Sequence, residues 1–399
     1  MAPFQSSSIW YWRRFSSPGD ATTSRADVLI VGAGASGLAV AAELSRRGVT
    51  PTLLDQDREV GGTWAGRYER LHLHTVRRYS GLPHYPLPRS LPRYVPTADY
   101  ARYLDQYARR FGLDVRLRQK VRRVRRDGGE WIVDTNDTQW RAPAVVIAMG
   151  RHNEPRLPAW PGVSDFRGKL LHSHEYKSGR AFAGRRALVV GIGNSGAEIA
   201  ADLVECGASS VAIAVRTPPP ITSREIAGIP VQLFGIALAG LPPRFVDRLG
   251  VLLRRVGTGD LTKYGLGAEQ WGPFTARRPP VIDVGFLGHL RAGRIQVRPD
   301  VARFVPEGVM FSDGIQLDCD VVVAATGYTT GLPAILAGID ALDERGYPRL
   351  DASHSDLWFA GYSESPRGQL YESNRAARGI ARAIAGALRE SRGKLPESE

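Results

Sequence analysis

The sequence has few cysteines, and the two that it has, Cys206 and Cys319, lie far apart. No CxxC pair is present, which argues against an enzyme that exchanges electrons through a redox-active disulfide. So few cysteines are typical of a protein that works in a reducing compartment. We therefore expect a cytoplasmic location.

The sequence also lacks an apolar run long enough to cross a bilayer, which takes about 20 residues in a helix. Its longest nearly apolar stretch, residues 229–241, contains Gln232 and is followed by Pro242 and Pro243. No membrane span is therefore expected. We interpret this stretch as a buried helix, and the wall of an apolar substrate channel or a surface that touches membrane remain as alternatives.

No targeting signal is predicted at the N-terminus. The twin arginine at 13–14 is followed by no apolar stretch before Asp27. We interpret the aromatic residues 10–15 as an arm that packs on the body of the protein or on a partner.

Negative charge is in deficit, since the net charge is +13 and the isoelectric point is about 10.0. The arginines are nevertheless spread along the chain, which argues against a nucleic-acid-binding module. The one dense run, residues 116–126, alternates in part with Leu117, Val121 and Val124, as strands with a solvated face do. The positive charge is expected to attract anionic small ligands.

Metal-ligand patterns are also missing. His72 and His74 form a close pair that could suggest a ligand set, but neither a carboxylate nor a cysteine stands near them at ligand spacing. No metal site is predicted.

Glycine, by contrast, is arranged in two nucleotide-binding fingerprints. Gly32, Gly34 and Gly37 follow an apolar run at 27–31, and a second GxGxxG motif at 191–196 follows the run 187–190. An alanine-rich stretch that is typical of a helix comes after each motif, the first predicted over 38–46. In such a loop the first glycine permits a tight turn, the second lets the backbone approach a pyrophosphate, and the third lets helix and strand pack closely. We therefore predict two dinucleotides, one of which brings a hydride that the other receives.

The residue after the next strand distinguishes the two sites. Asp55 ends the predicted strand 52–54, where an acid hydrogen-bonds the 2′-hydroxyl of an adenosine ribose. Arg216 ends the predicted strand 210–215, where an arginine pairs with a 2′-phosphate. The first site is therefore expected to bind FAD and the second NADPH.

Strand-then-glycine patterns recur at 144–150 and at 320–327. The first leads into Pro155, Pro158 and Pro161, which are typical of a linker. We interpret the second as the return of the chain to the first domain. The predicted fold is thus α/β, with two nucleotide-binding Rossmann-like domains: an NADPH-binding domain at 156–316 is inserted into an FAD-binding domain split into 1–155 and 317–399.

A further motif links the chain to a known family. Phe166, Gly168, His172 and Tyr176 stand at the spacing of the signature of class B flavin-containing monooxygenases, just before the second fingerprint. The chain resembles that family from about residue 27 to about residue 384, and it is most similar to the YUCCA branch. Other segments that carry the YUCCA-like resemblance are 176–179, 193–196, 262–265, 280–283 and 325–328.

The resemblance implies an NADPH- and FAD-dependent monooxygenase. In that family NADPH reduces FAD, oxygen adds at the flavin C4a position, and the (hydro)peroxyflavin oxygenates a small organic substrate. The YUCCA branch implies oxidative decarboxylation of an aryl 2-oxo acid such as indole-3-pyruvate. N- or S-oxygenation of a soft nucleophile stays open, as does an NADPH oxidase or reductase that releases hydrogen peroxide. The expected partners are the substrate and molecular oxygen, and a homo-oligomer is left open.

The resemblance also assigns site residues. His74 stands where animal-type members carry an active-site asparagine, and Asn194 opens the second fingerprint helix, so these two are the predicted catalytic residues. His172 and Tyr176 are expected to face the nicotinamide or to pack between the domains. Residues 361–368 depart from the family's glycine-rich turn near the flavin. The predicted cofactor-binding residues are Gly32, Gly34, Ala35, Ser36, Gly37, Asp55, Gly62, Thr63, Trp64, Gly191, Gly193, Asn194, Ser195, Gly196, Arg216, Thr326 and Gly327.

Overall fold

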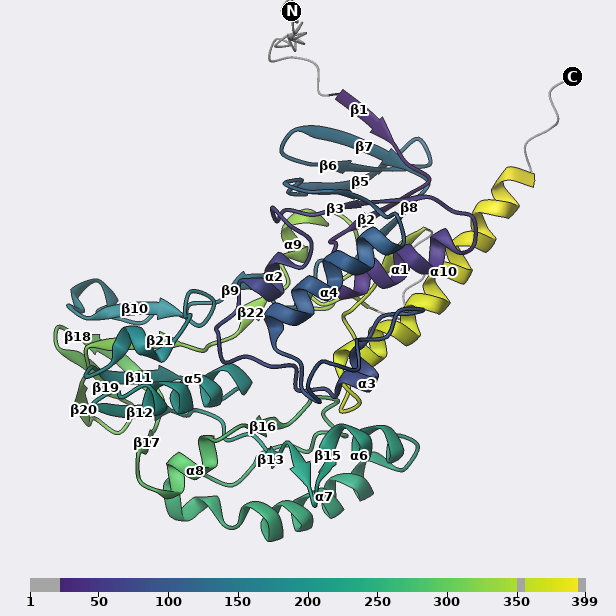
Figure 1. The fold of residues 1–399 in the computed structure, drawn as a ribbon. Coiled ribbons are helices and arrows are strands. Elements are labelled where there is room, and N and C mark those ends of the chain that lie inside the picture. Colours follow the sequence, from purple (N-terminus) through teal and green to yellow (C-terminus); the bar gives the residue numbers. More distant parts are fainter. Residues whose placement is uncertain (1–21, 350–355, 394–399) are drawn as a thin grey trace, which may run out of the picture.

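A computed structural model describes residues 22–349 and 356–393, and the predicted aromatic arm at 10–15 lies outside these ranges. Two parallel five-stranded sheets organise the chain into two bodies (Figure 1). This is the predicted α/β architecture. No helix in the described ranges is both long and apolar enough to span a membrane.

The first sheet has the strand order β23-β8-β2-β3-β4. Its strands are β2 (Val28–Val31), β3 (Pro51–Leu54), β4 (Asp114–Arg116), β8 (Ala144–Ile147) and β23 (Leu357–Phe359). Every residue of β2, β3 and β8 is buried, as expected of a parallel sheet covered on both faces.

Alternate residues of β2 pack against different layers. Val28 and Ile30 join the core formed with α1 (Ala35–Ser45), α4 (Thr97–Arg110) and α10 (Gln369–Gly393). Leu29 and Val31 face the opposite layer, which is built from α9 (Leu332–Ile335) and the small sheet of β1 (Thr22–Arg25), β5 (Arg123–Asp127), β6 (Glu130–Asp134) and β7 (Thr138–Ala142). The arginine-rich run supplies β5, whose Val124 is buried while Arg123 is exposed, as its alternation predicted.

The second sheet has the order β10-β21-β11-β12-β17. Its strands are β10 (Lys169–His172), β11 (Arg186–Val190), β12 (Ser210–Ala214), β17 (Ile295–Arg298) and β21 (Val321–Ala324). Helices α5 (Asn194–Glu205) and α8 (Phe286–Arg291) cover one face. The antiparallel strands β18 (Val301–Val305), β19 (Gly308–Phe311) and β20 (Gln316–Asp318) cover the other.

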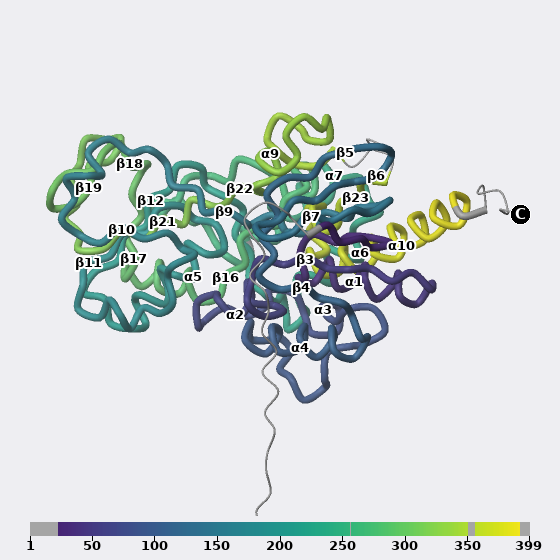
Figure 2. The backbone as a smooth tube through the Cα atoms, turned by 90° about the horizontal axis from the view of Figure 1, so that it is seen from above, coloured from purple at the N-terminus to yellow at the C-terminus, as the bar shows by residue number. Residues whose placement is uncertain are grey.

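The position of β21 corrects the predicted boundary at 316/317. This strand was interpreted as the return to the first domain, but it pairs in parallel with both β10 and β11 inside the second sheet. The chain crosses between the bodies at β9 (Glu154–Pro155) and β22 (Tyr328–Thr329), which pair antiparallel. Figure 2 shows these two crossings side by side between the bodies. A glycine follows β21 three residues after the strand ends, as one follows β8, and that pattern carries no information about which strands lie beside it.

A mixed layer closes the side of the second body that faces α3 (Arg77–Ser80). It contains β13 (Ile221–Ser223), which pairs with β16 (Val281–Asp283), and the hairpin of β14 (Glu225–Ile226) and β15 (Ile229–Pro230). Helices α6 (Val231–Ala237) and α7 (Pro243–Thr258) follow. The interpretation of 229–241 as one buried helix was wrong, because α6 is short and both Ile229 and Leu241 are exposed.

Candidate functional site

The first glycine loop has two glycines that the fold requires and one that it does not. Gly32 has a φ of +105°, and a Cβ there would lie 2.6 Å from the carbonyl oxygen of Ala148. A Cβ at Gly37 would lie 1.9 Å from the oxygen of Gly32. A Cβ at Gly34 would meet nothing within 4 Å. Gly34 therefore borders open space at the N-terminus of α1, where no side chain caps the helix.

The second loop repeats this geometry. Gly191 has a φ of +101°, and a Cβ there would lie 2.7 Å from the oxygen of Ala325. A Cβ at Gly196 would lie 1.9 Å from the oxygen of Gly191, whereas one at Gly193 would meet nothing within 4 Å. Helix α5 also begins without a side-chain cap. Each loop thus offers uncapped backbone N–H groups and open space, which suits a pyrophosphate.

Asp55 is held against the first loop. Its Oδ2 accepts a hydrogen bond from the backbone N–H of Ala33 at 2.6 Å, and its Oδ1 accepts one from Asp57 at 2.8 Å. Burial raises the pKa of Asp55, and the two backbone N–H groups oppose that shift. The carboxylate is therefore fixed at the carboxyl end of β3, beside the site where the adenosine end of a dinucleotide is expected.

The other residues predicted for the first site surround this loop. Ala35 is buried in the first turn of α1, and the Ser36 hydroxyl donates to the hydroxyl of Ser373 on α10 at 2.9 Å. The helix α2 (Gly62–Ala65) carries Thr63, whose hydroxyl donates to Asp57 Oδ2 at 3.2 Å. Trp64 meets Tyr100 edge-to-face, with ring centroids 5.1 Å apart.

Arg216 lies just beyond β12 and is exposed. Within the described ranges no hydrogen bond or ion pair engages its guanidinium. A cation at this strand end is free to meet an anion brought by a ligand.

Asn194 and Ser195, at the start of α5, contact two different segments. Asn194 Oδ1 accepts a hydrogen bond from the backbone N–H of Ile282 on β16 at 2.8 Å. The hydroxyl of Tyr68 lies close to the side chains of both Ser195 and Glu198 on this helix. Burial raises the pKa of Tyr68 well above its ordinary value, so this phenol stays protonated.

His74 also reaches α5. Its Nε2 lies 2.5 Å from Oε1 of Glu198, whose carboxylate is only 2% exposed. Glu198 stands four residues after Asn194, on the same side of the helix. The pair joins the segment that follows α2 to the second body. Sequence reasoning missed Glu198, because an acid inside a helix normally indicates a solvated face.

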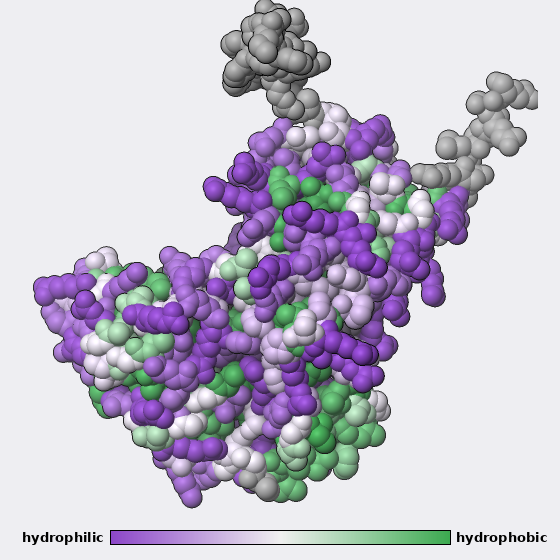
Figure 3. Space-filling view, viewed as in Figure 1, coloured by the Kyte–Doolittle hydropathy of each residue, from purple (hydrophilic) through white to green (hydrophobic). Residues whose placement is uncertain are grey.

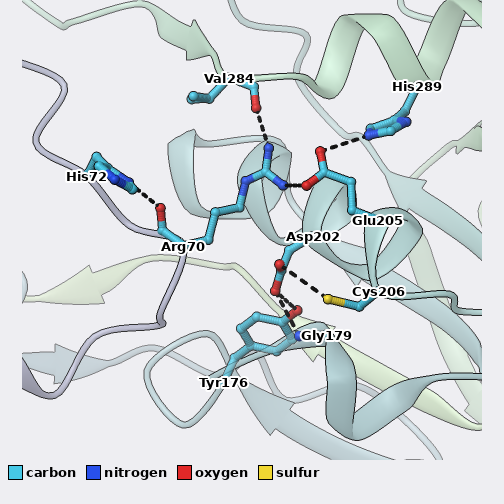
Figure 4. A network of polar contacts seen from close by, with 9 residues as sticks. All are labelled: Arg70, His72, Tyr176, Gly179, Asp202, Glu205, Cys206, Val284 and His289. Atoms are coloured by element: carbon cyan, nitrogen blue, oxygen red, sulfur yellow. Dashed lines mark hydrogen bonds and ion pairs between the residues drawn. The ribbon is translucent and has the colours of Figure 1, made fainter. Parts of the chain in front are cut away.

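A second polar cluster holds the same segment farther along α5 (Figure 4). Arg70 forms an ion pair with Glu205 and donates to the carbonyl of Val284 at 2.6 Å. His289 Nε2 lies 3.1 Å from the same carboxylate. Residues 68–74 are thus joined to α5 by two side-chain pairs, Arg70 with Glu205 and His74 with Glu198.

Tyr176 and His172 are both held by hydrogen bonds. The Tyr176 hydroxyl donates to the buried carboxylate of Asp202 at 2.6 Å (Figure 4). His172 Nε2 donates to the carbonyl of Gly327 at 3.0 Å, while its Nδ1 accepts from the backbone N–H of His174 at 3.1 Å. Burial lowers the pKa of His172, which agrees with a neutral ring.

Thr326 and Gly327 lie at the crossing between the bodies. The Thr326 hydroxyl donates to the carbonyl of Arg156 at 2.5 Å, and the N–H of Arg156 donates to Gly327 at 3.0 Å. These contacts join the two crossing strands. No cluster of three or more metal-ligating side chains occurs in the part of the chain that the structure describes.

Comparison with known proteins gives a consistent result. A model of the flavin-binding monooxygenase-like family matches residues 25–344. The chain is 38% identical over 381 residues to indole-3-pyruvate monooxygenase YUCCA8 of Oryza sativa subsp. indica, covering 90% of this chain and 89% of that protein. It is 36% identical to YUCCA1 of Oryza sativa subsp. japonica, with 87% and 89% covered.

Among solved structures, a flavin-containing monooxygenase from Stenotrophomonas maltophilia is similar at a TM-score of 0.70 and 27% identity, covering 91% of this chain and 99% of that one. Cyclohexanone monooxygenase in its ε-caprolactone complex has a TM-score of 0.72 at 18% identity, covering 93% and 89%. The second likeness concerns the fold alone.

Proposed function

The chain belongs to the flavin-binding monooxygenase-like family, and from this premise we propose that it oxygenates a small 2-oxo acid with FAD at the first loop and NADPH at the second. Flavin-dependent monooxygenation with FAD and NADPH is the activity of the family. The observation that carries the placement is the open middle glycine, Gly34 or Gly193, at each uncapped helix start. We also propose that the NADPH-binding unit extends from 156 to 327, so that it includes β21.

The residues present fit the two cofactors in defined roles. When bound and reduced, FAD would supply the chemistry that activates dioxygen. The chain would bind and orient the cofactors and exclude water. Gly34 and the N-terminus of α1 would hold the FAD pyrophosphate, with Asp55 at the ribose. Gly193 and Arg216 would hold the pyrophosphate and the 2′-phosphate of NADPH. His74 and Asn194 would stand between the two sites.

The substrate class rests on two observations. The relatives named above are indole-3-pyruvate monooxygenases, which act on a 2-oxo acid. In this chain, Arg224 follows β13 with its Nε buried and without a hydrogen-bond partner among the described residues. Its guanidinium lies over the ring of Tyr94, 4.4 Å from the centroid, and it interacts electrostatically with Glu198. We propose that Arg224 anchors the substrate carboxylate.

Arg224→Gln is expected to lower kcat/KM for indole-3-pyruvate by about 10- to 100-fold, because a charge-assisted hydrogen bond contributes about 1.5 to 3 kcal/mol. Oxygenation of a neutral sulfide should change little. Steady-state kinetics with both substrates measures the difference. Arg93→Gln is the matched control, since Arg93 is exposed and already paired with Glu225 at 2.8 Å. Equal losses with acid and sulfide would show that Arg224 has a structural role instead.

The reaction itself is tested with labelled dioxygen. The enzyme is given NADPH and a panel of 2-oxo acids, amines and sulfides, and products are analysed by mass spectrometry. Label in the shortened carboxylic acid supports decarboxylating oxygenation. Label only in N- or S-oxides supports oxygenation of soft nucleophiles. Hydrogen peroxide in place of every labelled product would identify an NADPH oxidase.

Arg216→Ala should weaken NADPH binding by about 10- to 100-fold, since it removes a charge-assisted contact with the 2′-phosphate. Use of NADH should change little. The ratio of kcat/KM values for the two nucleotides measures this selectivity. Arg303→Ala, which removes an exposed arginine on β18, serves as the control for net charge. Equal use of NADH and NADPH by the wild type would contradict the assignment.

His74→Ala and Asn194→Ala should shift consumed oxygen from product to hydrogen peroxide. The first variant removes the hydrogen bond between His74 and the buried Glu198, and the second leaves the N–H of Ile282 without its acceptor. Either change is expected to admit water beside the flavin, while FAD content and NADPH-driven flavin reduction stay near wild type. Product and peroxide formed per NADPH give the readout.

His84→Ala is the matched control for this coupling test, because His84 Nε2 pairs with Glu43 at 3.0 Å within the first body. It should leave the coupling ratio unchanged. Wild-type product yields in both site variants would mean that His74 and Asn194 only support the fold.

A further inference from the structure

Large exposed hydrophobic side chains gather on one part of the described surface. Phe245 is 58% exposed and Leu252 is 60% exposed, and both lie on α7. Figure 3 shows apolar side chains concentrated over α6 and α7. We call this surface the apolar face; its residues are Ile226, Ile229, Leu241, Phe245, Leu249, Leu252 and Leu253.

The helices behind the apolar face are anchored. The buried Asp247 of α7 accepts hydrogen bonds from the backbone N–H groups of Phe274 at 2.9 Å and Thr275 at 2.8 Å. On α6, Gln232 accepts from the N–H of Val76 at 2.9 Å and donates to the carbonyl of Arg367 at 2.8 Å. The opposite side of α7 therefore fixes which residues point outward.

The exposed apolar residues of α7 form a single stripe along one side of the helix. Phe245, Leu249, Leu252 and Leu253 follow one another at the i, i+4, i+7 and i+8 positions of one helix face. Exposed apolar surface of this extent marks a site of interaction with a protein or a membrane.

The exposed charges on α7 itself are of one sign. Residues 226–241 contain no charged side chain, and the only acid of α7 is the buried Asp247. Arg244, Arg248 and Arg255 are exposed on α7. An amphipathic helix with outward leucine and phenylalanine and flanking arginine is typical of a segment that lies in the interface of a bilayer.

We propose that the apolar face docks on the surface of a lipid bilayer that contains anionic lipids, without crossing it. Two copies of this chain would bring the same arginines together on proteins of net charge +13, which opposes self-association through this face. An anionic leaflet complements them. Strand β13 contacts α7 and pairs with β16, and the backbone N–H of Ile282 on β16 donates a hydrogen bond to Asn194. Docking would therefore place the candidate site close to lipid.

Co-sedimentation of the full-length holoenzyme with vesicles tests this proposal. Binding is expected to vesicles of equal parts phosphatidylcholine and phosphatidylglycerol, and to be much weaker with phosphatidylcholine alone. Phe245→Ser with Leu252→Ser should abolish sedimentation. Arg244→Gln with Arg248→Gln should weaken binding by about fivefold per arginine removed.

Two matched controls separate docking from general stickiness. Leu157→Ser with Ile315→Ser changes side chains of similar exposure, 50% and 48%, outside the apolar face. Arg46→Gln with Arg303→Gln removes two exposed arginines elsewhere. Both should bind vesicles like the wild type, and flavin content and thermal melting check that every variant is folded.

Sedimentation of Phe245→Ser/Leu252→Ser at the wild-type level would overturn the proposal. A second result would also overturn it: light scattering shows a wild-type dimer, the Phe245→Ser/Leu252→Ser variant is a monomer, and the wild type does not bind vesicles. The apolar face would then be a protein interface.

Discussion

Gly34→Val protein is expected to purify without flavin. The site at Gly34 has no neighbour within 4 Å of a Cβ, so the chain itself accepts the larger side chain. The same side chain would occupy the space from which a pyrophosphate reaches the N–H groups at the start of α1. Losing two charge-assisted hydrogen bonds at about 1.5 to 3 kcal/mol each weakens FAD binding at least about 100-fold. Visible absorbance and the FAD released on heat denaturation measure the loss.

The neighbouring glycine separates this effect from misfolding. Gly37→Val would place a Cβ against the carbonyl of Gly32, and it should lower both FAD content and the yield of folded protein. Gly34→Val should lose FAD while it keeps the far-ultraviolet circular dichroism of the wild-type chain. Stoichiometric FAD in purified Gly34→Val would refute the placement of the pyrophosphate.

The parts of this fold that could be predicted from sequence are those whose signals are local. Each glycine fingerprint predicts the strand before it, the turn and the start of the next helix. Asp55 follows at the end of the next strand. In both loops the structure places the first and third glycines against backbone and leaves the second open. The regular apolar spacing of residues 97–111 likewise predicts an amphipathic helix, and α4 ends one residue before that bound.

What sequence could not predict depends on partners far apart in the chain. Strand β21 is apolar and is followed by a glycine, and no local feature of its sequence indicates that β10 and β11 are its neighbours. Glu198 was not predicted as a site residue, because its partner His74 is 124 residues away in the sequence and only the fold brings the two together. The stretch 229–241 is apolar in composition, yet its ends face outward because α6 is fixed by Gln232. Composition alone does not distinguish a core helix from an exposed one.

Gly193→Val should give the reverse result to Gly34→Val: a protein that keeps its FAD but is not reduced by NADPH. The Gly193 site is as open as the Gly34 site, so the second body should fold normally. The added side chain would exclude the NADPH pyrophosphate from the start of α5, which implies at least about a 100-fold higher KM for NADPH. Anaerobic stopped-flow reduction measures this, and dithionite should still bleach the flavin. If Gly193→Val is reduced by NADPH at the wild-type rate and concentration dependence, the second loop does not hold the nicotinamide cofactor, and the division of the two loops between FAD and NADPH is wrong.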